Sequence, residues 1–445
     1  MRRFYLFIMV LFTPWLIFAQ TSGSHLQLTE NDVIELALQQ NLDLKQVQQK
    51  IVRYQAIAKE MNAQKWAALD FQSGYTHLSE VMEITFPTTS LAGLPFNIPT
   101  QKIRFGDGNT YEFALGLAQP LFTGGTLLNT ARAAQQEVLA LKWQQQANRN
   151  QIVFEAKKAF YHLIKAREMR KVAQTSIEQI KAHLKDVTNF YQQGQVTRNE
   201  VLTVEVKLSE AELLLTQANK AIELARIGLL MLLNQDLELA VTPEYDVQQW
   251  DTTFNRAVES FQPEDKAEVG ILKHQLTSLN FRRQAAKGAY WPSLGVFSRY
   301  VYGKPGLDQI ANEWMDYWIV GVNLKWNLWD WGKRSARVQQ LQSAADELEL
   351  GLEQLKSRLN ADLQRTRLNL KEAGQQLKIV HKMLTRAEEN FRIVENRYLQ
   401  GLIPNSEYLD AQADLTRSRL QKVQHLIDFQ LALADYRRAL TTDTN

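Results

Sequence analysis

The feature that most constrains the fold of this chain is an apolar stripe that occurs twice. Its members are Ile177, Ile180, Leu184, Val187 and Tyr191 in the first half, and Leu384, Ala387, Phe391, Val394 and Tyr398 in the second. Both stripes advance in steps of three and four residues, which is the spacing of the seam along a supercoiled helix. Both end in Tyr-x-x-Gly, at Gly194 and Gly401, and the constant offset of 398 − 191 = 207 residues indicates an internal duplication.

Four shorter segments alternate apolar and polar residues with the period of two that is typical of strands with one apolar face. They begin near Leu69, Tyr111, Leu294 and Trp318. The first matches the third at an offset of 294 − 69 = 225, and the second matches the fourth at the same offset of 207 as the helices. Each half therefore consists of a helix, a strand, a loop, a strand, a long helix, a turn and a helix.

Residues 1–19 are typical of a secretory signal peptide, with Arg2 and Arg3 before an apolar run and a plausible cleavage point after Ala19. An uncleaved membrane anchor is the alternative, and the short run, interrupted by Pro14, disfavours it. No later window approaches the ~18 uncharged apolar residues of a membrane helix. We therefore expect an exported chain that contacts a membrane by another route.

Residues that cap or break regular structure predict the ends of several elements. Thr29 or Asn31 should cap the first helix, which is expected to continue to about Trp66. Residues 80–110 contain several Gly and Pro and predict a loop, and Pro120 is expected to end the second strand.

The ends of the long helices are marked by a left-handed cap and by a capping pattern. Gly194 should close the first long helix, and Thr197 with Glu200 predicts a capping box for the next one. The helix expected over 333–398 would be roughly 100 Å long at about 1.5 Å per residue. Because no globular core is that deep, it must pack along other helices in a coiled coil or tube.

The four predicted strands have the length of tilted transmembrane strands, and aromatic residues lie near the ends of their apolar faces. We expect these faces to contact lipid. The predicted lipid-facing residues are Phe71, Tyr75, Phe113, Leu115, Leu117, Val296, Trp318, Val320, Val322, Leu324 and Trp326.

Four strands cannot close a barrel, and an open sheet edge is not tolerated in lipid. Since single-chain outer-membrane barrels have about eight strands or more, we expect copies of the chain to pool their strands. Two copies would give eight strands and three would give twelve, and the pattern alone does not choose. The alternative is a periplasmic coiled-coil scaffold without a pore, which the one-sided pattern of all four strands disfavours.

The composition argues against several classes of function. The net charge is +3 with both signs interspersed, which argues against a nucleic-acid partner. The absence of cysteine excludes disulfides, thiolate metal sites, catalytic thiols and a lipidated N-terminal cysteine. The sequence contains no HExxH, GxxxxGK[ST] or GxSxG motif. We therefore expect no cofactor, no metal and no enzymatic activity.

Taken together, these features resemble the TolC-like outer-membrane efflux factors over essentially all of the mature sequence. The motifs that carry the resemblance are the opening LTENDVIELALQQNLDL at 28–44, QPLFTGG at 119–125, AYWPSL at 289–294 and the two Tyr-x-x-Gly helix ends. The resemblance implies a mainly α fold with a transmembrane β-barrel. Four strands per subunit would contribute to a shared twelve-stranded barrel in a homotrimer, above a coiled-coil tunnel of long antiparallel helices in the periplasm.

The resemblance also implies a function: a passive exit duct of a tripartite efflux or type I secretion system, located in the outer membrane. Its partners would be a periplasmic adaptor, an inner-membrane pump and outer-membrane lipid. The expected segments are a signal peptide at 1–19, a periplasmic helix at 20–66, a transmembrane hairpin with its extracellular loop at 67–123, a long helical hairpin at 124–234, an equatorial insert at 235–263, a periplasmic helix at 264–291, a second transmembrane hairpin at 292–331, and a second helical hairpin with the C-terminal tail at 332–445.

Finally, the resemblance implies roles for residues near the two helical turns. It places Glu407, Asp410 and Tyr398 at a periplasmic aperture, where rings of acids favour cations. The alternative is that acids in a first helical turn complement the helix dipole. Adaptor docking is implied for the helix tips, although turn geometry alone would explain their glycines. The tip residues are Gly194, Val196, Thr197, Gly401, Leu402, Ile403 and Pro404.

Overall fold

The computed structural model describes residues 26–86, 89–90, 97–98, 101–246 and 262–440, so the expected signal peptide lies outside the described residues. The chain divides into two compact units. The helical unit comprises Met1–Leu42, Gln151–Arg256 and Thr366–Arg438, and the sheet unit comprises Asp43–Asn150, Ala257–Arg365 and Ala439–Asn445. Helices α3 (Thr126–Gln192) and α6 (Lys333–Leu399) have 67 residues each and contribute to both units.

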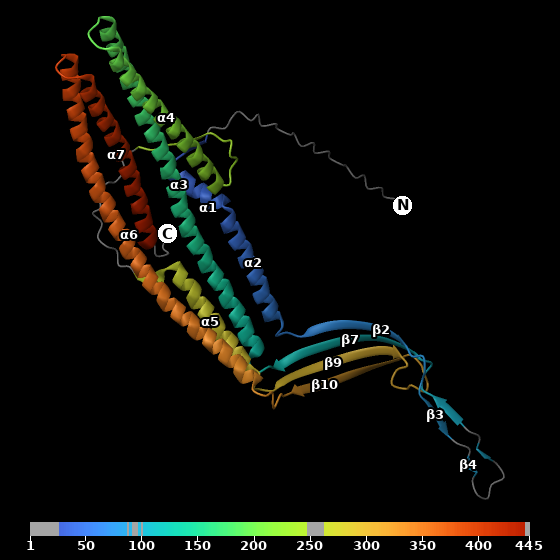
Figure 1. Ribbon diagram of the computed structural model, residues 1–445. Coiled ribbons are helices and arrows are strands. Elements are labelled where there is room, and N and C mark those ends of the chain that lie inside the picture. Colours follow the sequence, from blue (N-terminus) through green and yellow to red (C-terminus); the bar gives the residue numbers. More distant parts are fainter. Residues whose placement is uncertain (1–25, 87–88, 91–96, 99–100, 247–261, 441–445) are drawn as a thin grey trace, which may run out of the picture. The chain divides into compact units, whose positions relative to one another are not determined.

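The helical unit contains two helical hairpins (Figure 1). The end of α3 turns into α4 (Arg198–Leu232), and the end of α6 turns into α7 (Asn405–Leu440). Every member of the two predicted apolar stripes except Tyr191 lies in or packs against one buried cluster with residues of α4 and α7, so the predicted seam is confirmed up to its last residue in the first half. The two terminal tyrosines differ: Tyr398 is 8% exposed, whereas Tyr191 is 41% exposed beneath the Arg198 guanidinium, 6.0 Å away.

The N-terminal helix departs from its expected length. Thr29 caps α1 (Glu30–Gln40) through a reciprocal capping box with Asp32. The chain then leaves the helical conformation at Asn41 (φ −58°, ψ 128°) and α2 (Leu42–Ala63) begins. The expectation of one helix to about Trp66 was therefore wrong, because an extended residue interrupts the helical backbone.

Long-range contacts attach α1 to the rest of the helical unit. The Tyr161 hydroxyl donates to Glu30 Oε2 at 2.7 Å, and Lys157 Nζ lies 2.9 Å from Glu30 Oε1. Strand β1 (Leu26–Leu28) pairs in parallel with β8 (Val241–Pro243), and β8 lies within the segment expected as an irregular insert. That insert also ends in a short 3₁₀ helix at Pro263–Asp265, and residues 247–261 lie outside the described part.

The capping box expected at the start of α4 is absent. Thr197 occupies the N-cap position, but its side chain makes no capping hydrogen bond. The Glu200 carboxylate instead accepts a hydrogen bond from Asn405 Nδ2 at 2.9 Å. The carboxylate is thus used in a contact with the second hairpin rather than at the end of its own helix.

The sheet unit contains a four-stranded antiparallel sheet in the order β10-β9-β7-β2 (Figure 1). Its strands are β2 (Ala68–His77), β7 (Asn109–Phe122), β9 (Ser293–Lys304) and β10 (Met315–Lys325). Helices α2 and α5 (Ala267–Gly288) belong to the same unit. Among the described residues, no helix combines the length and apolar character needed to cross a membrane.

The expected ends of two strands need correction. Strand β7 continues past Pro120 to Phe122, because a bulge between these residues accommodates the proline. Strand β10 ends at Lys325, so Trp326 lies beyond the strand, where its Nε1 donates to the Tyr290 carbonyl at 3.1 Å.

The region expected as a loop contains short antiparallel pairs, which satisfy backbone groups that a bare loop would leave to solvent. These are β3 (Glu83–Phe86) with β6 (Gln101–Arg104), and β4 (Thr89–Ser90) with β5 (Asn97–Ile98).

Two glycines allow α3 to start against the end of α5. Gly124 has a φ of +62°, and a Cβ there would lie 2.2 Å from the Gly288 carbonyl oxygen. The Thr126 hydroxyl donates to the Ala285 carbonyl at 3.1 Å in the same junction. The QPLFTGG motif therefore connects strand β7 to helix α3 at a point where its backbone lies against the backbone at the end of α5.

We predict that Gly124→Ala destabilises the protein by about 2 kcal/mol or more, since it combines a left-handed backbone with a backbone clash. Gly351→Ala is the matched control, because Gly351 is helical and nothing lies within 4 Å of its added Cβ. The control should be neutral or stabilising by up to about 1 kcal/mol. Thermal unfolding followed by circular dichroism measures both, and equal midpoints for the two variants would contradict the prediction.

Candidate functional sites: the apolar sheet and the helix tips

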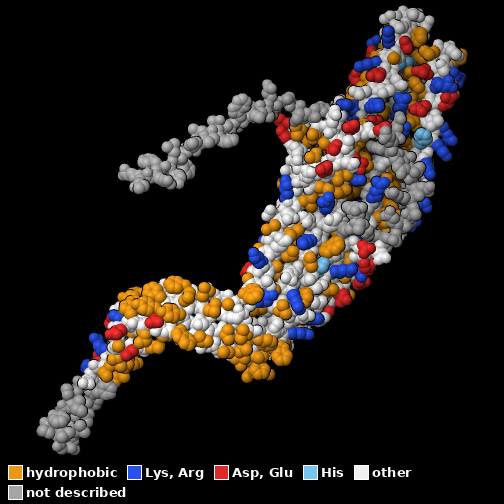
Figure 2. Space-filling view, turned by 180° about the vertical axis from the view of Figure 1, so that it is seen from behind, with side chains coloured by type: hydrophobic (Ala, Val, Ile, Leu, Met, Phe, Trp, Pro, Cys, Tyr) orange, Lys and Arg blue, Asp and Glu red, His pale blue; other side chains and the backbone are white. Residues whose placement is uncertain are grey.

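Strand register gathers the predicted lipid-facing side chains, apart from Trp326 beyond the end of β10, on one face of the sheet. One row of paired residues across the four strands is Phe71, Leu115, Tyr300 and Trp318. Val296 is half-buried, and the other predicted side chains are exposed, from 44% for Phe113 to 72% for Trp318. Figure 2 shows apolar side chains gathered over the strands, whereas charged side chains are spread over the helices. An apolar face of this extent requires a cover other than water.

Aromatic side chains concentrate at both ends of this face. At one end the Trp314 ring lies 5.0 Å from Tyr302 and 5.8 Å from Tyr111, and Tyr111 lies 5.0 Å from Tyr75. At the other end, a set of exposed tryptophans surrounds the strand–helix junctions: Trp66, Trp291, Trp326, Trp329 and Trp331. Trp314, Trp329 and Trp331 were not among the predicted site residues, although the clustering of tryptophan in 326–331 was visible in the sequence.

The distance between the two aromatic ends suits a bilayer. Strand β10 has 11 residues, which span roughly 36 Å at about 3.3 Å per residue. With the tilt of about 40° that membrane barrels have, its height is about 28 Å, close to their apolar band of about 25 Å. The opposite face of the sheet mixes small and polar residues, such as Ala114 and Gln72, with apolar ones, such as Phe297 and Ile319.

The two helix tips have the same backbone design. Gly194 and Gly401 have φ angles of +72° and +70°, and nothing lies within 4 Å of an added Cβ at either position. Each amide donates to the preceding tyrosine carbonyl at 2.9 Å, and the next amide donates to the carbonyl five residues earlier. This is the Schellman geometry that ends a helix. Glycine is therefore needed here for the backbone conformation and not for packing.

The other predicted tip residues divide into packed and exposed positions. Val196 and Ile403 pack against the buried cluster between the hairpins, whereas Leu402 and Pro404 are exposed. Thr197 stands at the start of α4. The tips thus combine an anchored apolar residue with exposed neighbours.

The predicted acidic pair lies on the surface of α7. Glu407 and Asp410 are both exposed, and within the described part of the chain neither carboxylate has an ion pair. Tyr398 does not lie beside them on the surface but is buried in the cluster between the hairpins. The structure therefore brings the two acids together and places Tyr398 in the packing beneath the tip.

A buried polar network joins the two hairpins at this level. His183 is 4% exposed, and its Nε2 lies 2.7 Å from Asn405 Oδ1. Asn405 in turn donates to Glu200, so α3, α7 and α4 are connected. The His183 ring stacks on Tyr408 at 3.9 Å and meets Tyr398 edge-on at 5.0 Å. Sequence reasoning missed His183, although it follows Ile180 by three residues and precedes Val187 by four, which is the seam spacing.

Burial disfavours the charged forms of the histidine and of the two tyrosines that pack against it. Burial lowers the pKa of His183, although the Asn405 bond and the Asp186 carboxylate act in the opposite direction. Burial, with Glu200 and Asp186 nearby, also raises the pKa of Tyr398. The pKa of Tyr408 is raised to about 12, mainly by burial, with Glu395 and Asp186 contributing.

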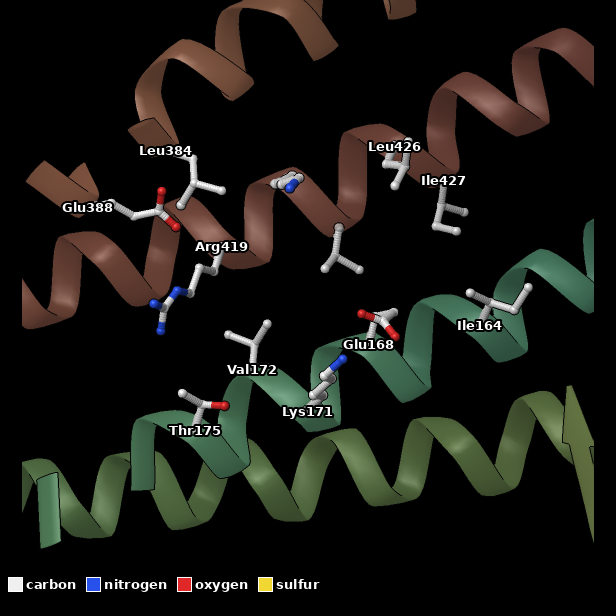
Figure 3. A pocket seen from close by; sticks show the side chains of 12 residues that line it. Ile164, Glu168, Lys171, Val172, Thr175, Leu384, Glu388, Arg419, Leu426 and Ile427 are labelled. Carbon is white, nitrogen blue, oxygen red and sulfur yellow. The ribbon is translucent and has the colours of Figure 1, made fainter. Parts of the chain in front are cut away.

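A groove of about 380 Å³ runs between α3, α6 and α7 in the helical unit (Figure 3). Its lining includes the acids Glu168 and Glu388 and the bases Lys171 and Arg419. The Tyr245 hydroxyl donates to Glu168 Oε1 at 2.6 Å. The mixed charges give the groove no single sign with which to select a ligand. In the described ranges, no group of three His, Asp or Glu side chains is arranged to hold a metal ion.

Comparison with known proteins places the chain in one family. Residues 33–235 and 268–442 match the family described as outer membrane efflux protein. No curated protein sequence matches the chain.

Solved structures with the same fold have low sequence identity to the chain. A crystal structure of CusC is 16% identical, with a TM-score of 0.78 over 92% of this chain and 91% of CusC. The Campylobacter jejuni CmeC outer membrane channel is 17% identical, with a TM-score of 0.75 over 94% of this chain and 87% of CmeC. The open state of the Neisseria gonorrhoeae MtrE outer membrane channel is 17% identical, with a TM-score of 0.74 over 92% of this chain and 88% of MtrE.

We predict that the tip contacts weaken as the pH falls below about 6.5, the ordinary pKa of histidine. Because the pKa of buried His183 is lowered, the packed tip binds fewer protons than the separated tip, so acid favours separation. Each unit of lowering is worth about 1.4 kcal/mol. The surrounding groups that modulate this effect are Asp186, Glu200, Glu395, Tyr398 and Tyr408.

Hydrogen exchange of tip peptides between pH 5 and 7.5, corrected for intrinsic rates, measures the tip opening. His183→Gln should open more readily than the wild type at pH 7.5 and should lose most of the pH dependence. The same pH dependence in both proteins would show that another group is responsible.

Proposed function

Because this chain belongs to the outer membrane efflux protein family, we propose that three copies of it share one barrel and one helical tunnel. The family match confirms the predicted resemblance to TolC-like efflux factors. The chain is accordingly the passive outer-membrane exit duct of a tripartite efflux system, and not an enzyme.

The observation that carries the trimer proposal is the apolar sheet with two open edges. Strands β2 and β10 each have only one neighbour in the four-stranded sheet of the described residues. The strands alternate in direction, so β2 of one copy would continue the antiparallel order next to β10 of another. An eight-stranded barrel is filled by its own side chains. A duct therefore needs a wider barrel, and twelve strands from three copies supply it.

Exposed apolar stripes on the helices support the same assembly. The stripe on α4 consists of Leu202, Val206, Leu213, Leu224 and Met231, which lie within about 40° of one another at about 100° per residue. A second exposed apolar stripe, on α6, includes Leu368, Ile379 and Ile393. In the proposed trimer these stripes are covered by helices of neighbouring copies, which would extend the duct as a tunnel into the periplasm.

We assign the expected segments to this arrangement. The hairpins at 67–123 and 292–331 would cross the outer membrane, and the helical hairpins at 124–234 and 332–445 would form the tunnel wall. The helix tips, with Gly194 and Gly401 at their turns, would dock a periplasmic adaptor, which in turn meets an inner-membrane pump. The exposed position of Leu402 and Pro404 supports this assignment, since docking requires accessible side chains.

The tip acids would control ion passage. Glu407 and Asp410 are exposed together on α7 and have no ion pair within the described part of the chain. Three copies would place six carboxylates around the opening, and such rings select for cations. The buried His183–Asn405–Glu200 network lies in the same unit and would hold the two hairpins of each copy together when the tip is closed.

The duct and the scaffold alternative differ in what a charge on the apolar face does. We predict that Val322→Lys prevents assembly, since a lysine facing lipid near the midplane costs about 2–4 kcal/mol per copy. Asn323→Lys is the matched control, because the adjacent residue points to the opposite face. Outer-membrane fractionation and heat-labile oligomer bands on gels measure the outcome. A wild-type protein that is a water-soluble monomer, or a Val322→Lys variant that assembles normally, would favour the scaffold.

For the aperture, we predict that Glu407→Gln combined with Asp410→Asn lowers cation preference and weakens block by divalent cations. The physical reason is the loss of six carboxylates at the opening. Reversal potentials in planar bilayers measure the change. Unchanged selectivity in a conducting double variant would support the alternative in which these acids only complement the helix dipole.

A further inference from the structure

We propose that Asp70, Glu112 and Arg299 form a charge filter inside the barrel, which favours small cations and cationic cargo over anions. The proposal rests on the proposed function, because these side chains face a lumen only if the sheet closes into a barrel. It adds a second selectivity element to the acids of the helix tips. The filter belongs to the sheet unit, whereas Glu407 and Asp410 belong to the helical unit.

Strand register places the three charges on the face opposite the apolar one. Asp70 pairs with Gly116, Gly116 pairs with Arg299, and these residues are each one position away from the exposed row of Phe71, Leu115 and Tyr300. Successive residues of a strand point to opposite faces. If the aromatic row contacts lipid, the charged row must point to the lumen.

Contacts across the sheet hold the charges in place. The Arg299 guanidinium forms an ion pair with Glu112 on the neighbouring strand β7. It also donates to Gln72 Oε1 at 3.5 Å, on strand β2 beyond. Arg299 is the seventh of the twelve residues of β9, which puts the pair near half the height of the strand.

Small residues adjoin these charges on strand β7, whereas Phe297 and Val301 flank Arg299 on β9 and Ile319 pairs with it on β10. A Cβ at Gly116 would lie 2.8 Å from both carboxylate oxygens of Asp70, so glycine makes room for that carboxylate. Ala114 is buried in the same face of β7, between Gly116 and Glu112. Glu112 and Arg299 remain partly exposed even though they are paired. The charged groups are therefore accessible to anything that passes.

The balance of charge predicts the sign of the selectivity. Arg299 compensates Glu112, whereas Asp70 has no ion pair among the described residues. Each copy thus contributes one uncompensated negative charge at this level of the wall. Charges that line a pore with low-dielectric walls set its ion preference. Removing the positive charge of Arg299 should therefore raise the net negative charge per copy from one to two, and removing the charge of Asp70 should reduce it to zero.

The test uses the purified full-length oligomer in planar bilayers with a KCl gradient near 0.1 M. Arg299→Gln is expected to raise the K⁺/Cl⁻ permeability ratio roughly twofold, and Asp70→Asn to lower it roughly twofold, by Coulomb's law over about 10 Å with a Debye length of about 10 Å. The double variant Arg299→Gln with Asp70→Asn has the wild-type charge, so its ratio should return close to the wild-type value. Arg299→Lys keeps the charge and should shift the ratio less than Arg299→Gln.

Two outcomes would overturn the filter while leaving the duct intact. In the first outcome, the single variants Arg299→Gln and Asp70→Asn both conduct and both keep the wild-type K⁺/Cl⁻ permeability ratio. In the second outcome, the two single variants shift this ratio in the same direction. If Arg299→Gln does not assemble, Asp70→Asn alone still tests the proposal, because its K⁺/Cl⁻ permeability ratio should fall below that of the wild type. A wild-type protein that forms no pores would instead contradict the proposed function itself.

Discussion

The constraint on which the rest of this structure depends is that backbone N–H and C=O groups in lipid must be hydrogen-bonded within protein. The four-stranded sheet meets this requirement between its strands and leaves it unmet at β2 and β10. Its apolar face, with aromatic residues at both ends, cannot remain in water either. In the proposed trimer, neighbouring copies would pair with both edges, and they would also cover the exposed apolar stripes on α4 and α6.

Duplication supplies most of the architecture, and divergence between the halves supplies the details at the tips. The two Schellman turns are equivalent down to their backbone hydrogen bonds. The tyrosines before them are not equivalent, because Tyr398 packs against His183 and Tyr408 whereas Tyr191 remains exposed. The buried His183–Asn405–Glu200 network takes its members from both hairpins. The two repeated hairpins therefore meet in one specific arrangement, because buried polar groups must find their partners and can fix the packing of the elements that carry them.

The four-stranded sheet places residues of different character on its two faces, because successive residues of a strand point to opposite sides. One face presents mainly apolar and aromatic side chains, and the other mixes small, polar and apolar residues with a few fixed charges. In a barrel these faces meet lipid and water, so each strand contributes to insertion and to selectivity with alternate residues. The identity of 16–17% to channels of the same fold fits this view, since strand alternation and helix length can persist while most side chains change.

Periodicity and turn chemistry were sufficient to predict the long helices within a few residues, the left-handed glycines at both tips, the four main strands and the face each presents. These features depend on residues close together in the chain. Pairing between distant segments was out of reach, because register and packing depend on partners that no local pattern identifies. Only the tertiary structure therefore showed the parallel β1–β8 pair, the strand pairs within 80–110 and the position of Trp326 beyond β10. It also showed that Glu200 accepts a hydrogen bond from Asn405 instead of capping its own helix.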